Sequence, residues 1–154
     1  RSRPLQRLAS TPMSSFTPRI PEQTLASYRT AEYAVFTEPA FVLKVDEPSA
    51  ALAALHERAG VRESAFITAC NPESAPLDEA TNAARQAELA RLLAAKGYAW
   101  IAAEGRSPAR NWVEPSYLVL GLGLEEGAAL GRRFAQNAIL HAAEDAVPRL
   151  VLLR

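Results

Sequence analysis

The sequence is poor in the residues on which cross-links, metal centres and histidine chemistry depend. Its 154 residues include one cysteine, Cys70, and two histidines. A single thiol cannot form an internal disulfide, which favours a reducing compartment, so we expect a cytoplasmic protein. The few potential ligands lack the spacing of a metal site, and no cofactor is expected. No apolar run approaches the roughly 18 residues that cross a bilayer.

An excess of charge of one sign is also missing. Seventeen basic residues balance seventeen acidic residues. A neutral chain has no overall field that attracts nucleic acid or an anionic membrane, so binding to either is not expected. With 49% hydrophobic and 22% charged residues, the composition is that of a globular protein. It identifies no protein partner.

The N-terminal thirty residues differ from the rest, with five arginines against a single acidic residue. A basic, acid-poor start has the composition of an organellar transit peptide. Alternatively, Met13, the only methionine, is the natural start, and residues 1–12 are not native. We expect residues 1–20 to form a flexible leader and residues 21–154 to form a single domain.

Hydrophobic periodicity and turn residues predict an α+β domain. Strands are expected at residues 33–36, 41–45, 64–69, 98–103, 116–121, 137–141 and 147–153. Helices are expected at residues 21–29, 49–60, 78–96 and 124–135, and a long irregular loop at residues 104–115. Because hairpins are interspersed with helices, this order favours a mixed, mostly antiparallel sheet, packed by two or three helices mainly on one face.

The most informative segment is the long helix expected at residues 78–96. The three leucines of its second half define the face that packs on the sheet. On its first half, the same face carries Asn82, Arg85 and Gln86, all within about 60° of Leu89 by helical geometry. Half of the inward face is therefore apolar and the other half is polar.

Burying an unpaired guanidinium costs several kcal/mol, so Arg85 must find partners or reach water. In one interpretation Arg85 pairs with a carboxylate such as Glu104 or Glu114, and Asn82 braces a loop. In the other, these groups line a pocket at the helix start, where backbone N–H groups favour anions. Asn71 ends the preceding strand and either joins this pocket or makes only an Asx turn.

The loop expected at residues 104–115 carries further candidates. Glu104 and Glu114 either act as paired carboxylates or are neutralised by nearby arginines. Trp112 either covers a ligand or anchors the loop, and loops of this length are often functional. Gln136, at the end of the last helix, either braces the pocket or caps the helix.

Two other patterns have simpler explanations. Cys70 with His56 or His141 would make a thiol nucleophile, but neither histidine lies in a recognisable motif and cysteine is commonly a buried hydrophobe. Residues 121–127 read GxGxxxG between a strand and a helix, as in a phosphate-binding loop. A tight turn with acidic residues at the helix start explains this pattern better.

The sequence contains several short motifs, one after another. They are Phe66-Ile-Thr-Ala-Cys-Asn71-Pro72, Asn82-x-x-Arg85-Gln86, Gly97-Tyr98, Trp112-x-Glu114-Pro-Ser116, Leu118-Val-Leu-Gly121 and Leu130-Gly-Arg-Arg-Phe134-x-Gln136-x-Ala-Ile139. In this order they resemble the bacterial domain-of-unknown-function family 3293, over about residues 27–153. The resemblance implies a small bacterial cytoplasmic protein and no established reaction. Cys70 stands where we expect a large aromatic residue in similar proteins, which weakens the case for a catalytic thiol.

The sequence leaves three functions open. The first is a binding module for a small anionic, nucleotide-like ligand, to which Arg85 supplies charge. The second is a hydrolase-type enzyme with Glu104 or Glu114 as general base, for which Glu114 needs a raised pKa and access to solvent. The third is an interaction protein in which the polar cluster is only structural. The candidate ligand-binding residues are Asn71, Asn82, Arg85, Gln86, Trp112, Glu114 and Gln136.

Overall fold

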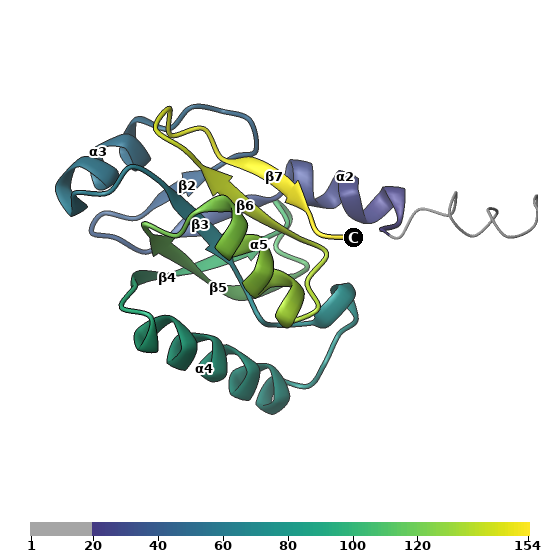
Figure 1. Ribbon diagram of the computed structural model, residues 1–154. Coiled ribbons are helices and arrows are strands. Elements are labelled where there is room, and N and C mark those ends of the chain that lie inside the picture. Colours follow the sequence, from purple (N-terminus) through teal and green to yellow (C-terminus); the bar gives the residue numbers. More distant parts are fainter. Residues whose placement is uncertain (1–19) are drawn as a thin grey trace, which may run out of the picture.

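A computed structural model describes residues 20–154 of the chain. The expected leader therefore lies outside the described residues, apart from Ile20. The strands are β1 (Glu32–Val35), β2 (Phe41–Leu43), β3 (Ser64–Ile67), β4 (Ala99–Arg106), β5 (Val113–Leu120), β6 (Ala138–Ala142) and β7 (Arg149–Leu152). They form one seven-stranded sheet in the order β2-β1-β4-β5-β3-β6-β7 (Figure 1). The predicted α+β class is confirmed, with the refinement that every strand pairing is antiparallel.

The helices begin and end near the residues that the sequence indicated. They are α2 (Glu22–Thr30), α3 (Ala50–Ala59), α4 (Glu79–Ala95) and α5 (Leu124–Arg133). Asp78 caps α4 by accepting a hydrogen bond of 2.6 Å from the backbone N–H of Thr81, and Ser49 caps α3 in the same way. Within the described part of the chain, no helix combines the length and apolar character needed to cross a membrane.

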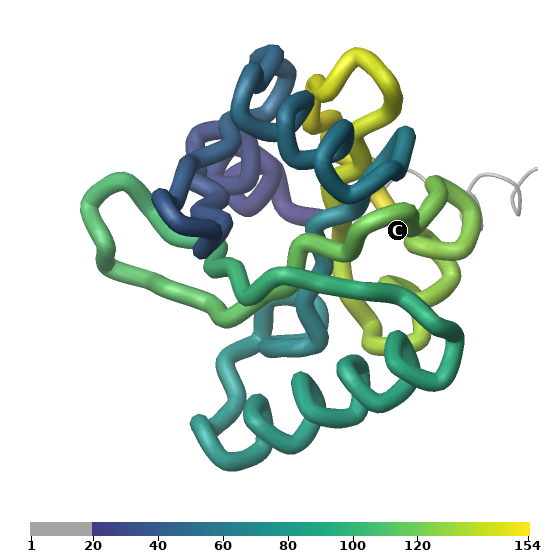
Figure 2. The backbone as a smooth tube through the Cα atoms, turned by 90° about the vertical axis from the view of Figure 1, so that its left-hand side faces the viewer, coloured from purple at the N-terminus to yellow at the C-terminus, as the bar shows by residue number. Residues whose placement is uncertain are grey.

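The sheet is covered on both faces, whereas the sequence predicted cover mainly on one. Leu52 of α3 packs with Phe66 on one face, and Leu89 of α4 packs with Ile67 on the other. Figure 2 shows α3 and α4 on opposite sides of the sheet. The interior strand β3 is buried along its whole length, which is typical of a strand covered on both faces.

The prediction of a long loop at residues 104–115 is wrong. Strands β4 and β5 extend into this segment and leave a connection of residues 107–112. Pro115 lies inside β5. Its carbonyl accepts a hydrogen bond of 2.7 Å from the Thr68 hydroxyl, just beyond the end of β3. The proline nitrogen points to the same side as this carbonyl, where the ladder with β3 has ended. The missing N–H therefore costs no ladder hydrogen bond.

Candidate functional site

A cavity of about 340 Å³ lies between α2 and the sheet. Its apolar lining comes mainly from Tyr33, Phe66, Trp112, Ile139, Leu140 and Leu150. Its polar lining includes Ser27, Tyr28, Thr68, Asn71, Ser74, Glu114, Ser116 and Gln136. Four of the seven predicted ligand-binding residues, Asn71, Trp112, Glu114 and Gln136, are thus brought to one cavity.

Strand register places Glu114 beside an open position. Gly105 of β4 is the partner of Glu114 on one side and of Tyr33 on the other, so all three occupy the same face of the sheet. A Cβ atom added to Gly105 would lie 3.7 Å from the Tyr33 ring and 3.8 Å from the Trp112 ring. The absence of a side chain at Gly105 therefore leaves space between the two aromatic rings and the carboxylate. Ser116, two residues along β5, faces the same cavity.

Glu114 is the one charged side chain among the described residues that line this cavity. Its Oε2 atom accepts a hydrogen bond of 2.9 Å from the Asn71 side-chain amide, and no described residue donates to Oε1. Burial raises the pKa of Glu114 from 4.5 to about 7, although the hydrogen bond from Asn71 lowers it. Near neutral pH this carboxyl can therefore give or take a proton.

Asn82 of α4 fixes the orientation of Asn71. The Asn82 Oδ1 atom accepts from the Asn71 backbone N–H at 2.9 Å, and Asn82 Nδ2 donates to Asn71 Oδ1 at 2.8 Å. With its carbonyl oxygen occupied in this way, Asn71 turns its amide nitrogen toward Glu114. Asn82 does not line the cavity, and it lies on a second hollow on the opposite face of the sheet.

Arg85 points inward, as the helical projection predicted, but its partners are backbone carbonyls. Its Nε atom donates to Ala69 O at 2.6 Å, and a terminal nitrogen donates to Phe134 O at 2.5 Å. The guanidinium also lies 5.8 Å from the centre of the Phe134 ring. Arg85 therefore joins the end of β3 to the end of α5, and it contacts neither the expected carboxylates nor the cavity.

Two glutamines hold the same segment. Gln86 is buried, and its Oε1 atom accepts from the Ala69 backbone N–H at 2.8 Å. Gln136 donates to Cys70 O at 2.9 Å while also lining the cavity. The inward polar residues of α4 thus fasten the chain segment that follows β3.

The fastened segment has an unusual backbone. Asn71, Glu73 and Ser74 have positive φ angles of 47°, 54° and 63°, and Ala135, which faces them, has φ 57°. The Glu73 backbone N–H donates to Ala135 O at 2.8 Å. Left-handed conformations of such residues cost on the order of 1–3 kcal/mol each and persist only where their surroundings hold them. The structural contacts of α4 therefore support the segment that carries Asn71 to the cavity.

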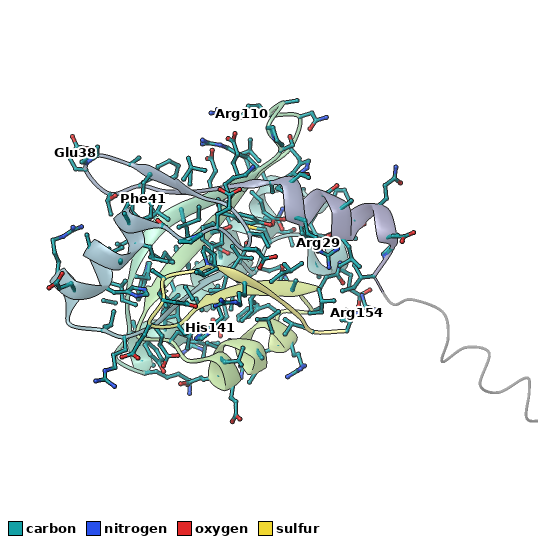
Figure 3. The ribbon with its side chains drawn as sticks, turned by 90° about the horizontal axis from the view of Figure 1, so that it is seen from above. Arg29, Glu38, Phe41, Arg110, His141 and Arg154 are labelled. Carbon is teal, nitrogen blue, oxygen red and sulfur yellow. The ribbon has the colours of Figure 1, made fainter. Side chains whose placement is uncertain are left out.

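Glu104 does not pair with Glu114, because the two side chains lie on opposite faces of the sheet. Glu104 is registered with Pro115, one position away from Glu114. Its carboxylate accepts a hydrogen bond of 3.0 Å from Arg106, which also pairs with Glu32 at 2.9 Å. The prediction that Glu104 and Glu114 act as paired carboxylates is therefore wrong, and of the two only Glu114 lines the cavity. Arg110, the other arginine of this hairpin, lies at its projecting tip (Figure 3).

Cys70 lacks the surroundings of a nucleophile. The thiol is buried, and burial raises its pKa, which disfavours the reactive thiolate. His56 lies 2.8 Å from a buried serine hydroxyl of β3, and His141 lies 2.8 Å from the carboxylate of Glu63. The hydrogen bonds of both histidines therefore go to groups other than Cys70.

The GxGxxxG segment forms the turn at the start of α5. Gly123 is the N-terminal cap residue, and a Cβ atom there would lie 3.2 Å from a carboxylate oxygen of Glu63. An acidic group at this position opposes phosphate binding. Across the described residues, no group of three or more His, Cys, Asp or Glu side chains is placed to hold a metal ion.

Sequence reasoning missed Tyr28, Tyr33, Gly105 and Ser116, which all line the cavity. A usable signal was present for Ser116, because Glu114 and Ser116 share a face if the strand runs through Pro115. The aromatic residues Tyr28 and Tyr33 come from the first described helix and strand. Only the tertiary fold brings them to the cavity that Glu114 and Ser116 line.

Fold and site together define an α+β protein with an antiparallel sheet and a partly open cavity that contains one carboxyl group. Residues 67–139 match the family described as protein of unknown function, DUF3293. This match confirms, over residues 67–139, the resemblance that the short sequence motifs indicated. Comparison with curated proteins and with solved structures gave no match.

Proposed function

We propose that this protein binds a small molecule in the cavity beneath α2 and recognises it through Glu114. The observation that carries the proposal is the position of Glu114, the one charged group that the described residues contribute to the lining. One of its carboxylate oxygens is bonded to Asn71, and the other accepts no hydrogen bond from a described residue. A volume of about 340 Å³ with a largely apolar lining and a few polar groups is typical of small-molecule sites.

The cavity favours a different ligand from the anion expected at Arg85. Its lining, as far as residues 20–154 form it, includes no arginine, lysine or histidine, and an anion would meet the Glu114 carboxylate. The Arg85 guanidinium is occupied by the two backbone carbonyls. A ligand that presents a hydrogen-bond donor to Glu114 fits these surroundings better.

The alternative hydrolase-type function is supported by one specific observation. A general base works best when its pKa lies near the working pH, and the pKa of Glu114 is about 7. Glu114 also lines a cavity that a substrate can occupy. In that case Glu114 takes a proton from the attacking group, and the cavity that binds the ligand is also the active site.

The test is a thermal-shift screen of metabolites against the wild type and two variants. Gly105→Leu fills the space beside Glu114, and Glu114→Gln removes the charge. Ligands of the site are expected to stabilise the wild type by about 2.7 kcal/mol at one hundred times Kd and to lose this effect in both variants. Glu104→Gln, which removes a carboxylate on the opposite face, is the matched control and should respond as the wild type does. Stabilisation that survives in Gly105→Leu, or no stabilisation of the wild type by any compound, contradicts the proposal.

A further inference from the structure

We infer that the ligand of this cavity carries an ammonium group on an apolar body, and that the ammonium group binds to Glu114 among aromatic rings. The inference rests on the proposed function and names the class of ligand. Three observations support it: the missing counter-charge of Glu114, the aromatic residues around it, and the single free oxygen of its carboxylate.

Glu114 differs from the other half-buried glutamates of the described chain, because each of the others has a basic partner. Glu32 and Glu104 share Arg106, whereas Glu63 lies against His141. Glu88 and Glu126 pair with Arg91 and Lys96, respectively. Among the half-buried glutamates of residues 20–154, only Glu114, next to the cavity, has no basic partner in this part of the chain. A cation bound in the cavity would supply the positive charge that the described residues do not place beside Glu114.

The groups around this carboxylate are those that attract a cation. Tyr33 and Trp112 both approach Gly105, directly opposite Glu114 in the strand register. Phe66 packs edge-on against Tyr33, with ring centres 5.2 Å apart, and lines the same cavity. Aromatic rings attract cations through their faces and also provide an apolar surface for the body of the ligand.

The carboxylate geometry favours an ammonium group over a guanidinium group. A guanidinium typically binds both oxygens of a carboxylate in parallel, but Asn71 already occupies Oε2. An ammonium group acts as a point charge and needs only the free Oε1 atom. Ser116 can accept a second N–H, since its hydroxyl donates to Glu114 O at 3.1 Å and keeps its lone pairs available.

Ammonium binding should be linked to the ionisation of Glu114. The other titratable groups that face Glu114 are Tyr28 on α2, Tyr33 on β1 and Cys70 after β3. They are two phenols and a thiol, and burial raises the pKa of Tyr33 and of Cys70. A bound ammonium group favours the carboxylate form, so ligand affinity should increase as the pH rises through about 7 and Glu114 ionises.

Three probes with the same aromatic body test the charge of the ligand: phenethylamine, 2-phenylethanol and phenylacetate. We expect calorimetry above neutral pH to show at least about tenfold tighter binding of the amine than of the alcohol, a difference of about 1.4 kcal/mol. Phenylacetate should bind most weakly. Glu114→Gln should abolish the preference for the amine, and Glu104→Gln should preserve it. Below about pH 6 the preference of the wild type should also diminish, because Glu114 is then protonated.

The inference is overturned if the alcohol or the acid binds as tightly as the amine, or if the preference for the amine persists in Glu114→Gln. It is also overturned if none of the three probes binds, or if phenethylguanidine binds more tightly than phenethylamine. The proposed function fails separately, when no compound in the metabolite screen stabilises the wild type. A neutral compound that protects the wild type but not Gly105→Leu would retain the cavity site and exclude the ammonium class.

Discussion

Glu114 is positioned by hydrogen bonds that run from Asn82, outside the cavity, through Asn71 to the Glu114 carboxylate. Asn82 on α4 bonds both the backbone N–H and the side-chain carbonyl of Asn71, and Asn71 donates to Glu114. Asn82 therefore acts as a positioning residue, since it reaches the carboxylate only through Asn71. Its effect should be visible in the ionisation of Glu114.

We expect Asn82→Ala to raise the pKa of Glu114 above its value of about 7. Without Asn82, the Asn71 amide is free to turn away, and the carboxylate loses the hydrogen bond that favours its charged form. NMR titration of the carboxyl carbon of Glu114 measures this change directly. Ala84→Ser, an exposed substitution on the same helix, is the control. An unchanged titration in a folded Asn82→Ala protein would contradict the relay through Asn71.

The direction of these side chains was predictable, but their partners were not. Helical periodicity placed Asn82, Arg85 and Gln86 on the inward face, and the structure confirms that Gln86 is buried and that all three bond inward. The partners of Arg85 are carbonyls of Ala69 and Phe134. Every residue carries a backbone carbonyl, so no residue type in the sequence indicates such a partner.

At the scale of elements, α2 is the wall of the cavity that is held most lightly. None of its residues is buried. Its attachment centres on Tyr28, whose hydroxyl shares a hydrogen bond of 2.6 Å with Ser74 and accepts one of 3.0 Å from Asn137. The Tyr28 carbonyl accepts from the Tyr33 hydroxyl at 2.6 Å. An element with little buried surface and few anchors opens at low free-energy cost, so α2 is the natural entrance for a ligand.

Tyr28→Phe should therefore speed hydrogen exchange of the α2 amides by about fivefold to tenfold, the effect of losing roughly 1 to 1.5 kcal/mol of hydrogen bonding. The ring is retained, so exchange in β3 and β5 should change little. Tyr98→Phe is the matched control, since it removes a tyrosine hydroxyl bonded to Glu126 of α5 and leaves the anchor of α2 intact. Equal exchange of α2 in both variants would contradict the role of Tyr28 as its main anchor.

Most elements of this fold are encoded in local signals, and the β4–β5 hairpin shows where such signals fail. Capping by Ser49 and Asp78 and the left-handed Gly60 match the predicted helix limits. Within residues 104–115, however, Gly105 and Pro115 locally indicate a loop. Pro115 fits into β5 because the Pro115 nitrogen points to the side where the pairing with β3 has already ended. Strand β3 is distant in the sequence, so the sequence around Pro115 does not indicate where this pairing ends. Because the strands were not predicted here, the pairing of Glu114 with Gly105 could not be predicted either.

At the scale of the whole molecule, the cavity costs stability. The protein has packed cores on both faces of its sheet, yet it keeps a left-handed segment beside a half-buried carboxyl to which residues 20–154 supply no counter-charge. A protein under selection for stability alone would replace Glu114 with a neutral residue. The cost of keeping the charge is open to measurement, because it appears only where Glu114 is ionised.

Burial raises the pKa of Glu114 from 4.5 to about 7, so the folded protein holds this proton more tightly than the unfolded chain does. The resulting stability is fully present below about pH 4.5 and is lost as the pH rises to about 7. Relative to Glu114→Gln, the wild type should therefore lose on the order of 3 kcal/mol of unfolding free energy across this window. Above it, Glu114→Gln should be the more stable protein.

Urea unfolding of both proteins between about pH 4 and pH 8 measures this difference. The comparison cancels the other titrating groups, such as Asp78 and Asp145, whose lowered pKa values make stability rise with pH in both proteins. If the unfolding free energies of the two proteins change in parallel with pH, water already solvates the Glu114 carboxylate. Ligand binding would then not be expected to depend on the ionisation of Glu114. If the curves diverge, a saturating ammonium ligand should bring them back together, since it restores at high pH the stability that ionisation removed.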